Sequence, residues 1–121
     1  MDQSSMLQTA SILLLMTAAG GVLMALQRLG QKKNPPDWLA MAHGLIAASA
    51  LTLLIYAAAL GGVPSSALIG TIVLLAASAG GVVMNLVYHL AGKLLPQWLL
   101  HVHITLAAVG MGLVAWGAWA N

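Results

Sequence analysis

Four long apolar runs constrain the fold of this chain more than any other feature. They cover residues 6–27, 38–60, 66–91 and 97–120, and short Gly-, Pro- or polar-rich stretches separate them. Each run has about the 20 residues that an α-helix needs to cross a hydrocarbon core. The chain is 61% apolar and 5% charged, far from the roughly 25% charged residues of a soluble domain. The sequence therefore predicts an all-α transmembrane four-helix bundle.

The few charged residues predict the orientation of the bundle. Arg28, Lys32 and Lys33 are assigned to the first connection and Lys93 to the third, whereas the second connection has no charge. The positive-inside rule then places connections one and three in the cytoplasm and both termini outside. We expect an integral protein of a bacterial inner membrane. The first run is not expected to be cleaved, because "MDQSSMLQ" contains no basic residue.

A repeat of sixty residues divides the chain into two halves, 1–60 and 61–120, which align without a gap. About a third of the aligned positions are identical, and the identities cluster. The segment "AGGVLMAL" faces "AGGVVMNL", and "PPDWLAMAHGLIA" faces "LPQWLLHVHITLA". We therefore predict one transmembrane domain, residues 1–121, made of two tandem helical hairpins.

The repeat predicts where two histidines lie. Each hairpin has an even number of spans, so the copies should be related by a pseudo-two-fold axis along the membrane normal. In an up-down bundle the second and fourth helices lie on one diagonal. His43 in the second span and His103 in the fourth are repeat-equivalent, and we expect them to face each other across the axis.

Both histidines are expected within the hydrocarbon region. Each lies seven residues after a repeated proline, Pro36 or Pro96, which is about 10 Å along a helix. Trp38 and Trp98 should anchor at the interface. Ionisable side chains at this depth usually face the bundle interior and form a site. Two imidazoles at one level match the axial ligands of a haem b. The alternatives are another metal, a proton relay, or a hydrogen-bonded pair that only joins helices.

Small residues recur at the same level on the other two helices. Gly20-Gly21 and Gly80-Gly81 lie about 11 Å from the cytoplasmic ends of spans one and three. We expect them to leave a gap for the haem, with close helix packing as the alternative. Met24 and Met84, about one turn nearer the cytoplasm, are predicted to line an edge of the cofactor. Ordinary packing and ligation of a soft metal are their other roles.

Two further histidines lack a histidine at the equivalent position. His89 is expected near the cytoplasmic surface, where it and Arg28 with the connection lysines would contact haem propionates, or it would have no ligand there. His101 is two residues from His103, about 200° around a helix, so both cannot bind one central ion. A second haem on His89 and His101 would need the last two helices to separate. Asp37 is expected to cap the second helix.

This set of residues resembles the core of membrane b-type cytochromes, in which axial histidines lie on one diagonal of a four-helix bundle and glycines on the other. The resemblance implies haem b as cofactor, with His43 and His103 as ligands near the cytoplasmic side. Diheme members carry two ligands on each ligand helix. Here the outer halves of helices two and four offer only Tyr56, Trp116 and Trp119, so one haem is implied.

Two axial imidazoles favour electron transfer over catalysis, so we expect an electron-transfer component rather than a stand-alone enzyme. The expected partners are the lipid bilayer and a redox protein or a quinone. A homo-oligomer or a larger complex is left open, and a net charge of +2 gives no reason to expect nucleic acid.

Three other functions remain alternatives at this stage. The chain resembles small multidrug resistance transporters in size and helix count, but its first span has no acidic residue. An accessory subunit of a larger membrane complex would need no cofactor of its own. Histidine ligation of a chlorophyll-type magnesium is a variant of the cofactor hypothesis.

Overall fold

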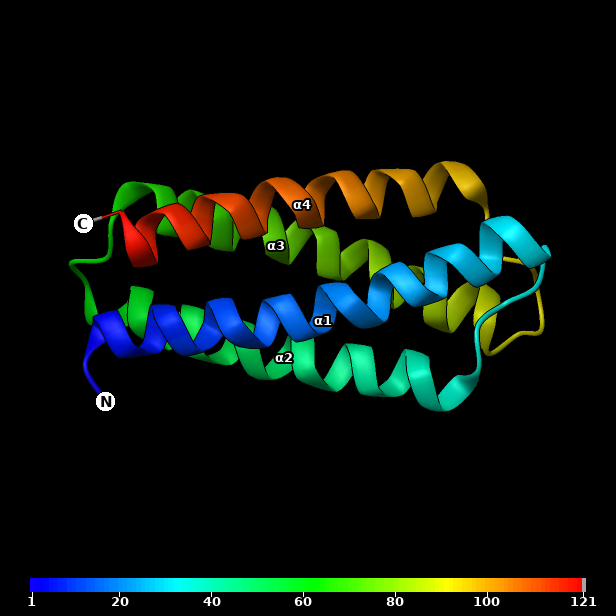
Figure 1. Ribbon diagram of the computed structural model, residues 1–121, viewed down its shortest axis with the longest axis horizontal. Coiled ribbons are helices and arrows are strands. Elements are labelled where there is room, and N and C mark those ends of the chain that lie inside the picture. The colour runs from blue at the N-terminus through cyan, green and yellow to red at the C-terminus, as the bar shows by residue number, and fades with distance from the viewer. Residues whose placement is uncertain (121) are drawn as a thin grey trace.

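A computed structural model describes residues 1–120 and confirms the all-helical bundle (Figure 1). Its elements, in order, are α1 (Gln3–Gln31), α2 (Asp37–Leu60), α3 (Ser65–Val83), the π-helix η1 (Met84–His89) and α4 (Gln97–Trp119). No strand occurs within residues 1–120. Each of the four spans, with η1 counted as part of the third, is long and apolar enough to cross a membrane. The chain is therefore an integral membrane protein.

The helices pack in up-down order. Within each hairpin, α1 packs on α2 and α3 on α4, and between hairpins α1 contacts α4 and α2 contacts α3. Consequently α2 and α4 lie on one diagonal. Both termini and connection 61–64 lie at one end, here called the termini end, and connections 32–36 and 90–96 lie at the other (Figure 1). We call the latter the basic end because it carries the three lysines.

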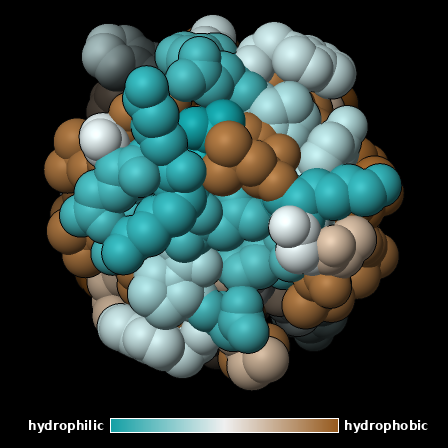
Figure 2. All heavy atoms as spheres, turned by 90° about the vertical axis from the view of Figure 1, so that its right-hand side faces the viewer, coloured by the Kyte–Doolittle hydropathy of each residue, from teal (hydrophilic) through white to brown (hydrophobic). Residues whose placement is uncertain are grey.

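Exposed aromatic side chains mark both ends of the bundle. Trp38 and Trp98 are exposed near the basic end, and Trp116 and Trp119 near the termini end. Trp98 and Trp116 are 18 residues apart on α4, or about 27 Å, which is close to the thickness of a hydrocarbon core. Polar side chains cover the basic end itself, with apolar side chains around its rim (Figure 2). This distribution fits two interfacial aromatic belts.

The main apolar core fills the half of the bundle next to the termini end, where residues of all four helices are buried. Each hairpin closes there on small residues at repeat-equivalent positions, because small side chains let two helix backbones approach. These residues are Ala10, Ala50 and Ala57 in the first hairpin, and Gly70, Gly110 and Gly117 in the second, all of them buried.

Hydrogen bonds join the two connections at the basic end. The Nδ2 of Asn34 donates to the carbonyl of Lys93 at 2.7 Å, and the N–H of Leu95 donates to Oδ1 of Asn34 at 3.0 Å. The Nε of Arg28 donates to the carbonyl of Leu95 at 2.7 Å. The assignment of Arg28 to the first connection was wrong, because α1 continues to Gln31. The guanidinium folds inward and the side chain is buried at 6% exposure.

The repeat is interrupted at η1. The N–H of Leu90 bonds to the carbonyl of Asn85 at 2.9 Å, and the N–H of Lys93 to that of Tyr88 at 2.8 Å, so both bonds span five residues. One extra residue in a turn rotates the side chains that follow relative to α1, which stays α-helical. Met84, the first residue of η1, is buried, whereas its counterpart Met24 is only partly buried.

Asp2, rather than Asp37, caps a helix. Asp2, at the N-terminal tail, caps α1 by accepting a hydrogen bond from the N–H of Ser5 at 2.7 Å, and this bond lowers the pKa of Asp2. The predicted cap at Asp37 is wrong, because Pro36 occupies the N-cap position and no side chain caps α2. Asp37 still lies in the first turn, where the helix dipole favours its charge.

Candidate functional site

The structure brings His43 of α2 and His103 of α4 together across the diagonal of the bundle. Their ring centres are 6.2 Å apart, and the ring planes are inclined by 60°. Both side chains are partly buried. The register of the repeat thus correctly indicated two imidazoles at one level.

Each histidine is held by a carbonyl of the neighbouring helix in its own hairpin. Nδ1 of His43 lies 2.9 Å from the carbonyl oxygen of Thr17, and Nδ1 of His103 lies 2.7 Å from that of Ala77. Thr17 and Ala77 are themselves repeat-equivalent, so the two bonds correspond. A carbonyl only accepts, so each Nδ1 carries the proton. Each Nε2 therefore keeps a free lone pair, the form in which imidazole binds a metal.

The glycines at this level make room for the imidazole rings. A β-carbon on Gly21 would lie 3.1 Å from Cε1 of His43, and one on Gly81 would lie 3.2 Å from Cε1 of His103. Gly20 and Gly80 are less restricted, since their nearest neighbours would be 3.9 and 4.0 Å away. Because Gly21 and Gly81 have no side chain, each ring can lie against the neighbouring helix of its own hairpin. Its Nδ1 then reaches the carbonyl of Thr17 or Ala77 on that helix. A gap for the haem beside the glycines stays a prediction.

The side chains around the histidine pair are partly exposed. We call four stretches of helix there the histidine layer: residues 18–27 of α1, 37–49 of α2, 78–83 of α3 and 101–109 of α4. No residue within these stretches is buried, although Thr17 and Ala77 at their edge are. All four helices bury residues in the half next to the termini end. The side chains of the histidine layer are therefore more exposed than those of the main apolar core.

The two predicted methionines differ in position. Met84 packs with Leu95, Leu99 and Leu100 in a small apolar cluster at the basic end, so packing is its role in this structure. Met24 lies in the histidine layer, one turn from Gly20 on α1, and is partly buried. A role for Met24 at the edge of a cofactor stays a prediction.

His89 and His101 are separate from the central pair. Nε2 of His89 lies 2.7 Å from Oδ1 of Asp37, and the side chains are 8% and 83% exposed. His101 is exposed, and its Nδ1 lies 2.6 Å from the carbonyl of Gln97 one turn earlier on α4. Neither of them joins the central pair in a group of three or more metal-binding side chains within residues 1–120. A second haem on His89 and His101 stays a prediction.

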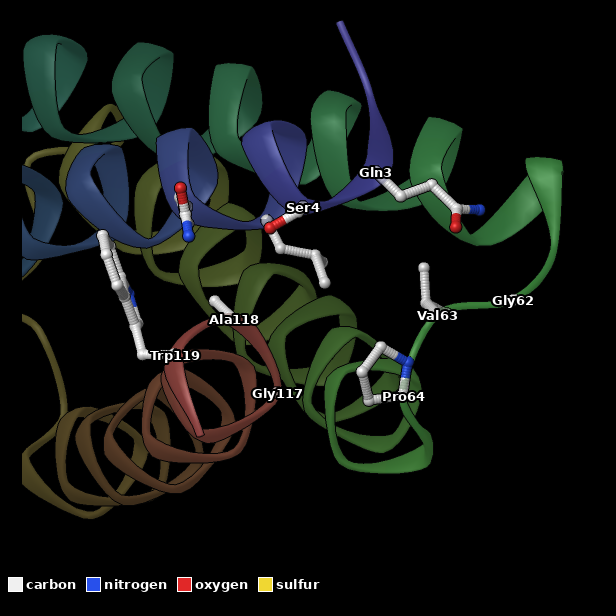
Figure 3. A pocket seen from close by; sticks show the side chains of 10 residues that line it. Gln3, Ser4, Gly62, Val63, Pro64, Gly117, Ala118 and Trp119 are labelled. Carbon is white, nitrogen blue, oxygen red and sulfur yellow. The ribbon is translucent and has the colours of Figure 1, made fainter. Parts of the chain in front are cut away.

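A hollow in the surface lies far from the histidines. It opens at the termini end between the start of α1, connection 61–64 and the end of α4, as Figure 3 shows. Gln3, Ser4 and Trp119 are among its lining residues, and none of the lining side chains is titratable. This hollow offers no group for acid–base or metal chemistry, so the histidine pair remains the candidate site.

Two features of the structure were missed at the level of sequence. The acceptors of the two histidines are the main-chain carbonyls of Thr17 and Ala77, and the residue types of a sequence do not predict which main-chain groups accept such bonds. The approach of Gly70 to Gly110 could have been predicted, because Ala10 and Ala50 are small at the equivalent positions.

Comparison with family models, with curated proteins and with solved structures finds no match to this chain.

Proposed function

We propose that the chain is a small membrane haem protein that transfers electrons, with one haem b held between His43 and His103. The spacing of the two rings is the main support. Two imidazoles that bind one metal through Nε2 have ring centres about 6 Å apart, because each bond is about 2 Å long and the ring centre lies about 1 Å further. The distance in this chain is 6.2 Å.

The number of ligands favours a metal in a macrocycle over a bare ion. No three metal-binding side chains come together within residues 1–120. A structural zinc site needs four protein ligands and a catalytic one needs three, whereas a porphyrin supplies four nitrogens and needs only axial ligands from the protein. The chain has no cysteine for a covalent attachment, which makes a non-covalent b-type haem the cofactor that fits.

The surroundings of the pair suit such a ligand set. The Nδ1–H bonds to the carbonyls of Thr17 and Ala77 fix the tautomer and the orientation of both rings. The histidine layer contains no fully buried residue, so a flat apolar molecule there would displace fewer close-packed side chains than one in the main apolar core. The protein residues would therefore bind the cofactor, orient it and exclude water.

Bound haem would supply reversible one-electron chemistry. His43 and His103 would together fill both axial positions, which disfavours binding of oxygen or substrate and favours electron exchange at the haem edge. Residues 1–120 form no folded part outside the four spans and their short connections. The electron partner is accordingly a second protein or a membrane-soluble quinone.

We also propose that the basic end faces the cytoplasm of a bacterial cell, because Lys32, Lys33 and Lys93 lie there. The chain has no cysteine, so single cysteines report topology cleanly. A membrane-impermeant maleimide should label Ser65→Cys in intact spheroplasts, and should label Gln31→Cys only after permeabilisation. Both residues are exposed. The reverse labelling pattern would mean the opposite orientation.

The haem proposal is tested by the absorption spectrum of the protein purified in detergent from cells that make haem. We expect sharp α and β bands and a shifted Soret band on reduction with dithionite. Carbon monoxide should leave the reduced spectrum unchanged, because both axial positions would be filled by histidine.

Two results would count against the proposal. A folded, helical protein that remains colourless after haem is supplied would favour a transporter or an accessory subunit without a cofactor. A reduced spectrum that changes with carbon monoxide would show that only one histidine binds the iron.

A further inference from the structure

Arg28 is a cation that the protein buries without a counter-ion. It lies in the last turn of α1 and is only 6% exposed. Its Nε donates to the carbonyl of Leu95, which is a neutral group, and Arg28 makes no other hydrogen bond within residues 1–120. The only ion pair in that part of the chain joins His89 to Asp37. Because buried charges are normally paired, the guanidinium has room for an anion as its partner.

The two Nη atoms of Arg28 can be reached from outside. Within residues 1–120, the only enclosed side-chain atom without a hydrogen-bond partner is Oε1 of Gln27. The Nη atoms also have no partner, so they must reach the molecular surface. Their N–H groups form a planar fork, which is the geometry that binds the oxygens of a phosphate or a carboxylate. Arg28 can therefore bind an anion through donors that the fold leaves unused.

The other cations lie on the two connections that meet at Arg28. Asn34 bonds to the main chain of residues 93–95, the segment that also holds the Nε of Arg28. Lys32 and Lys33 directly precede Asn34, and all three lysines of the chain are exposed at this end. The basic end thus carries four cations and one carboxylate, and Figure 2 shows its polar surface. It should attract anions.

The depth of Arg28 favours the phosphate of a lipid over an anion on a soluble protein. Trp38 and Trp98, in the first turns of α2 and α4, are exposed and mark the interface at this end. Arg28 is three residues from the end of α1, or about 5 Å, and its Nε bonds to a residue two positions before α4 begins. The guanidinium therefore lies near the level of the indoles, where lipid phosphates lie. A carboxylate of a soluble protein would have to pass the headgroups to reach it.

We infer that the basic end binds an anionic phospholipid of the surrounding leaflet, whose phosphate accepts hydrogen bonds from the Nη groups of Arg28. The phosphate supplies the missing counter-ion and can accept both branches of the fork. The exposed lysines add attraction for a lipid with a net negative charge. This site is on the surface of the bundle, so the inference does not depend on the proposed haem.

The test measures the binding of dioleoyl phosphatidylglycerol and of dioleoylglycerol to the full-length protein in detergent, by native mass spectrometry. The two lipids share their acyl chains, and only the first has a phosphate. Arg28→Gln should bind phosphatidylglycerol about tenfold more weakly than the wild type does, the effect of hydrogen bonding to a charged group. Its affinity for dioleoylglycerol should change less than threefold. Lys33→Gln, the matched control, loses the same charge at an exposed position. It should weaken phosphatidylglycerol binding by about fivefold or less, the effect of one lysine near an anionic surface.

Four results would overturn the inference. An equal loss for both lipids in Arg28→Gln would mean that Arg28 acts through packing. An equal loss of phosphatidylglycerol binding in Arg28→Gln and Lys33→Gln would mean that net charge alone attracts the lipid. Displacement of phosphatidylglycerol from the wild type by millimolar inorganic phosphate would make a free phosphate the ligand. Displacement by poly-L-glutamate would make an acidic protein the partner.

The wild type alone decides the question if Arg28→Gln does not fold. In 1 M NaCl the Debye length is about 3 Å, so the attraction of the exposed lysines is screened, whereas contact with a buried cation persists. Under these conditions phosphatidylglycerol should still raise the melting temperature in detergent by several degrees more than dioleoylglycerol does. Equal melting temperatures with the two lipids would contradict a bound phosphate.

Discussion

Replacement of either His43 or His103 by alanine should abolish the six-coordinate haem spectrum. At the proposed haem site each change would remove one of two histidine ligands, and loss of an outer partner of a ligand alone typically weakens metal binding by 10 to 100-fold. We expect the affinity for haem to fall by at least that factor, and any haem that still binds to bind carbon monoxide. The two variants should behave alike, because the environments of the rings correspond in both hydrogen bonds and glycine contacts. Absorption spectra and haem content per protein measure both effects.

His101→Ala is the matched control, since His101 is exposed and bonds only to its own helix. His89→Ala is a second control that breaks the contact with Asp37 and should leave the spectrum unchanged. If all four alanine variants lost haem equally, general destabilisation would explain the loss and the ligand assignment would fail. If the pair only joined helices, each central variant would lose about 1 kcal/mol of stability in a protein without colour.

The bundle and the shared level of the two histidines could be predicted from the sequence, because they depend on the lengths of the apolar runs and on the sixty-residue repeat. Apolar length determines the number of spans, and the sixty-residue register places His43 and His103 at one height whatever the details of packing. The spans were less accurate at their ends. The first apolar run was expected to end at residue 27, but α1 continues to Gln31, because a helix can continue where the apolar pattern stops. Arg28 was assigned to a connection for that reason.

The rest of the site depended on three-dimensional contacts that no period encodes. The π-helix η1 begins at Met84, and its segment MNLVYH shares only Met and Leu with the equivalent α-helical segment MALQRL. The equivalence of Met84 and Met24 therefore did not predict that their surroundings differ. The partner of His89 is Asp37, which is 52 residues away.

The two hairpins differ in the small residues at which their helices pack together. The first is closed by alanines, which pack methyl groups between the helices. The second has glycines at the same positions, so its backbones approach more closely. A β-carbon on Gly70 would lie 2.8 Å from the carbonyl oxygen of Gly110, and one on Gly110 would lie 2.7 Å from Cγ of Leu74. Alanine is therefore accommodated at residues 10 and 50 of the first hairpin, whereas it would clash at the equivalent residues 70 and 110 of the second.

Gly70→Ala should consequently destabilise the protein, even though alanine is natural at the equivalent residue 10. The added methyl group would meet backbone atoms of Gly110 and Val114 within 3 Å, and backbone cannot move aside as a flexible side chain can. Overpacking of this kind costs about 1–3 kcal/mol, which exceeds the gain of about 1 kcal/mol from replacing glycine in a helix. The melting temperature of the protein in detergent, followed by circular dichroism, measures the difference.

Gly112→Ala provides the control on α4, because a β-carbon there would have no neighbour within 4 Å. It gains the helix propensity without a clash, so its melting temperature should equal or exceed that of the wild type. The reciprocal change, Ala50→Gly, should destabilise by about 1 kcal/mol through lost propensity and lost packing of a fully buried methyl group. Should Gly70→Ala melt as high as Gly112→Ala, α3 and α4 would have to separate at little cost, and the close approach of Gly70 to Gly110 would not be what holds the second hairpin together.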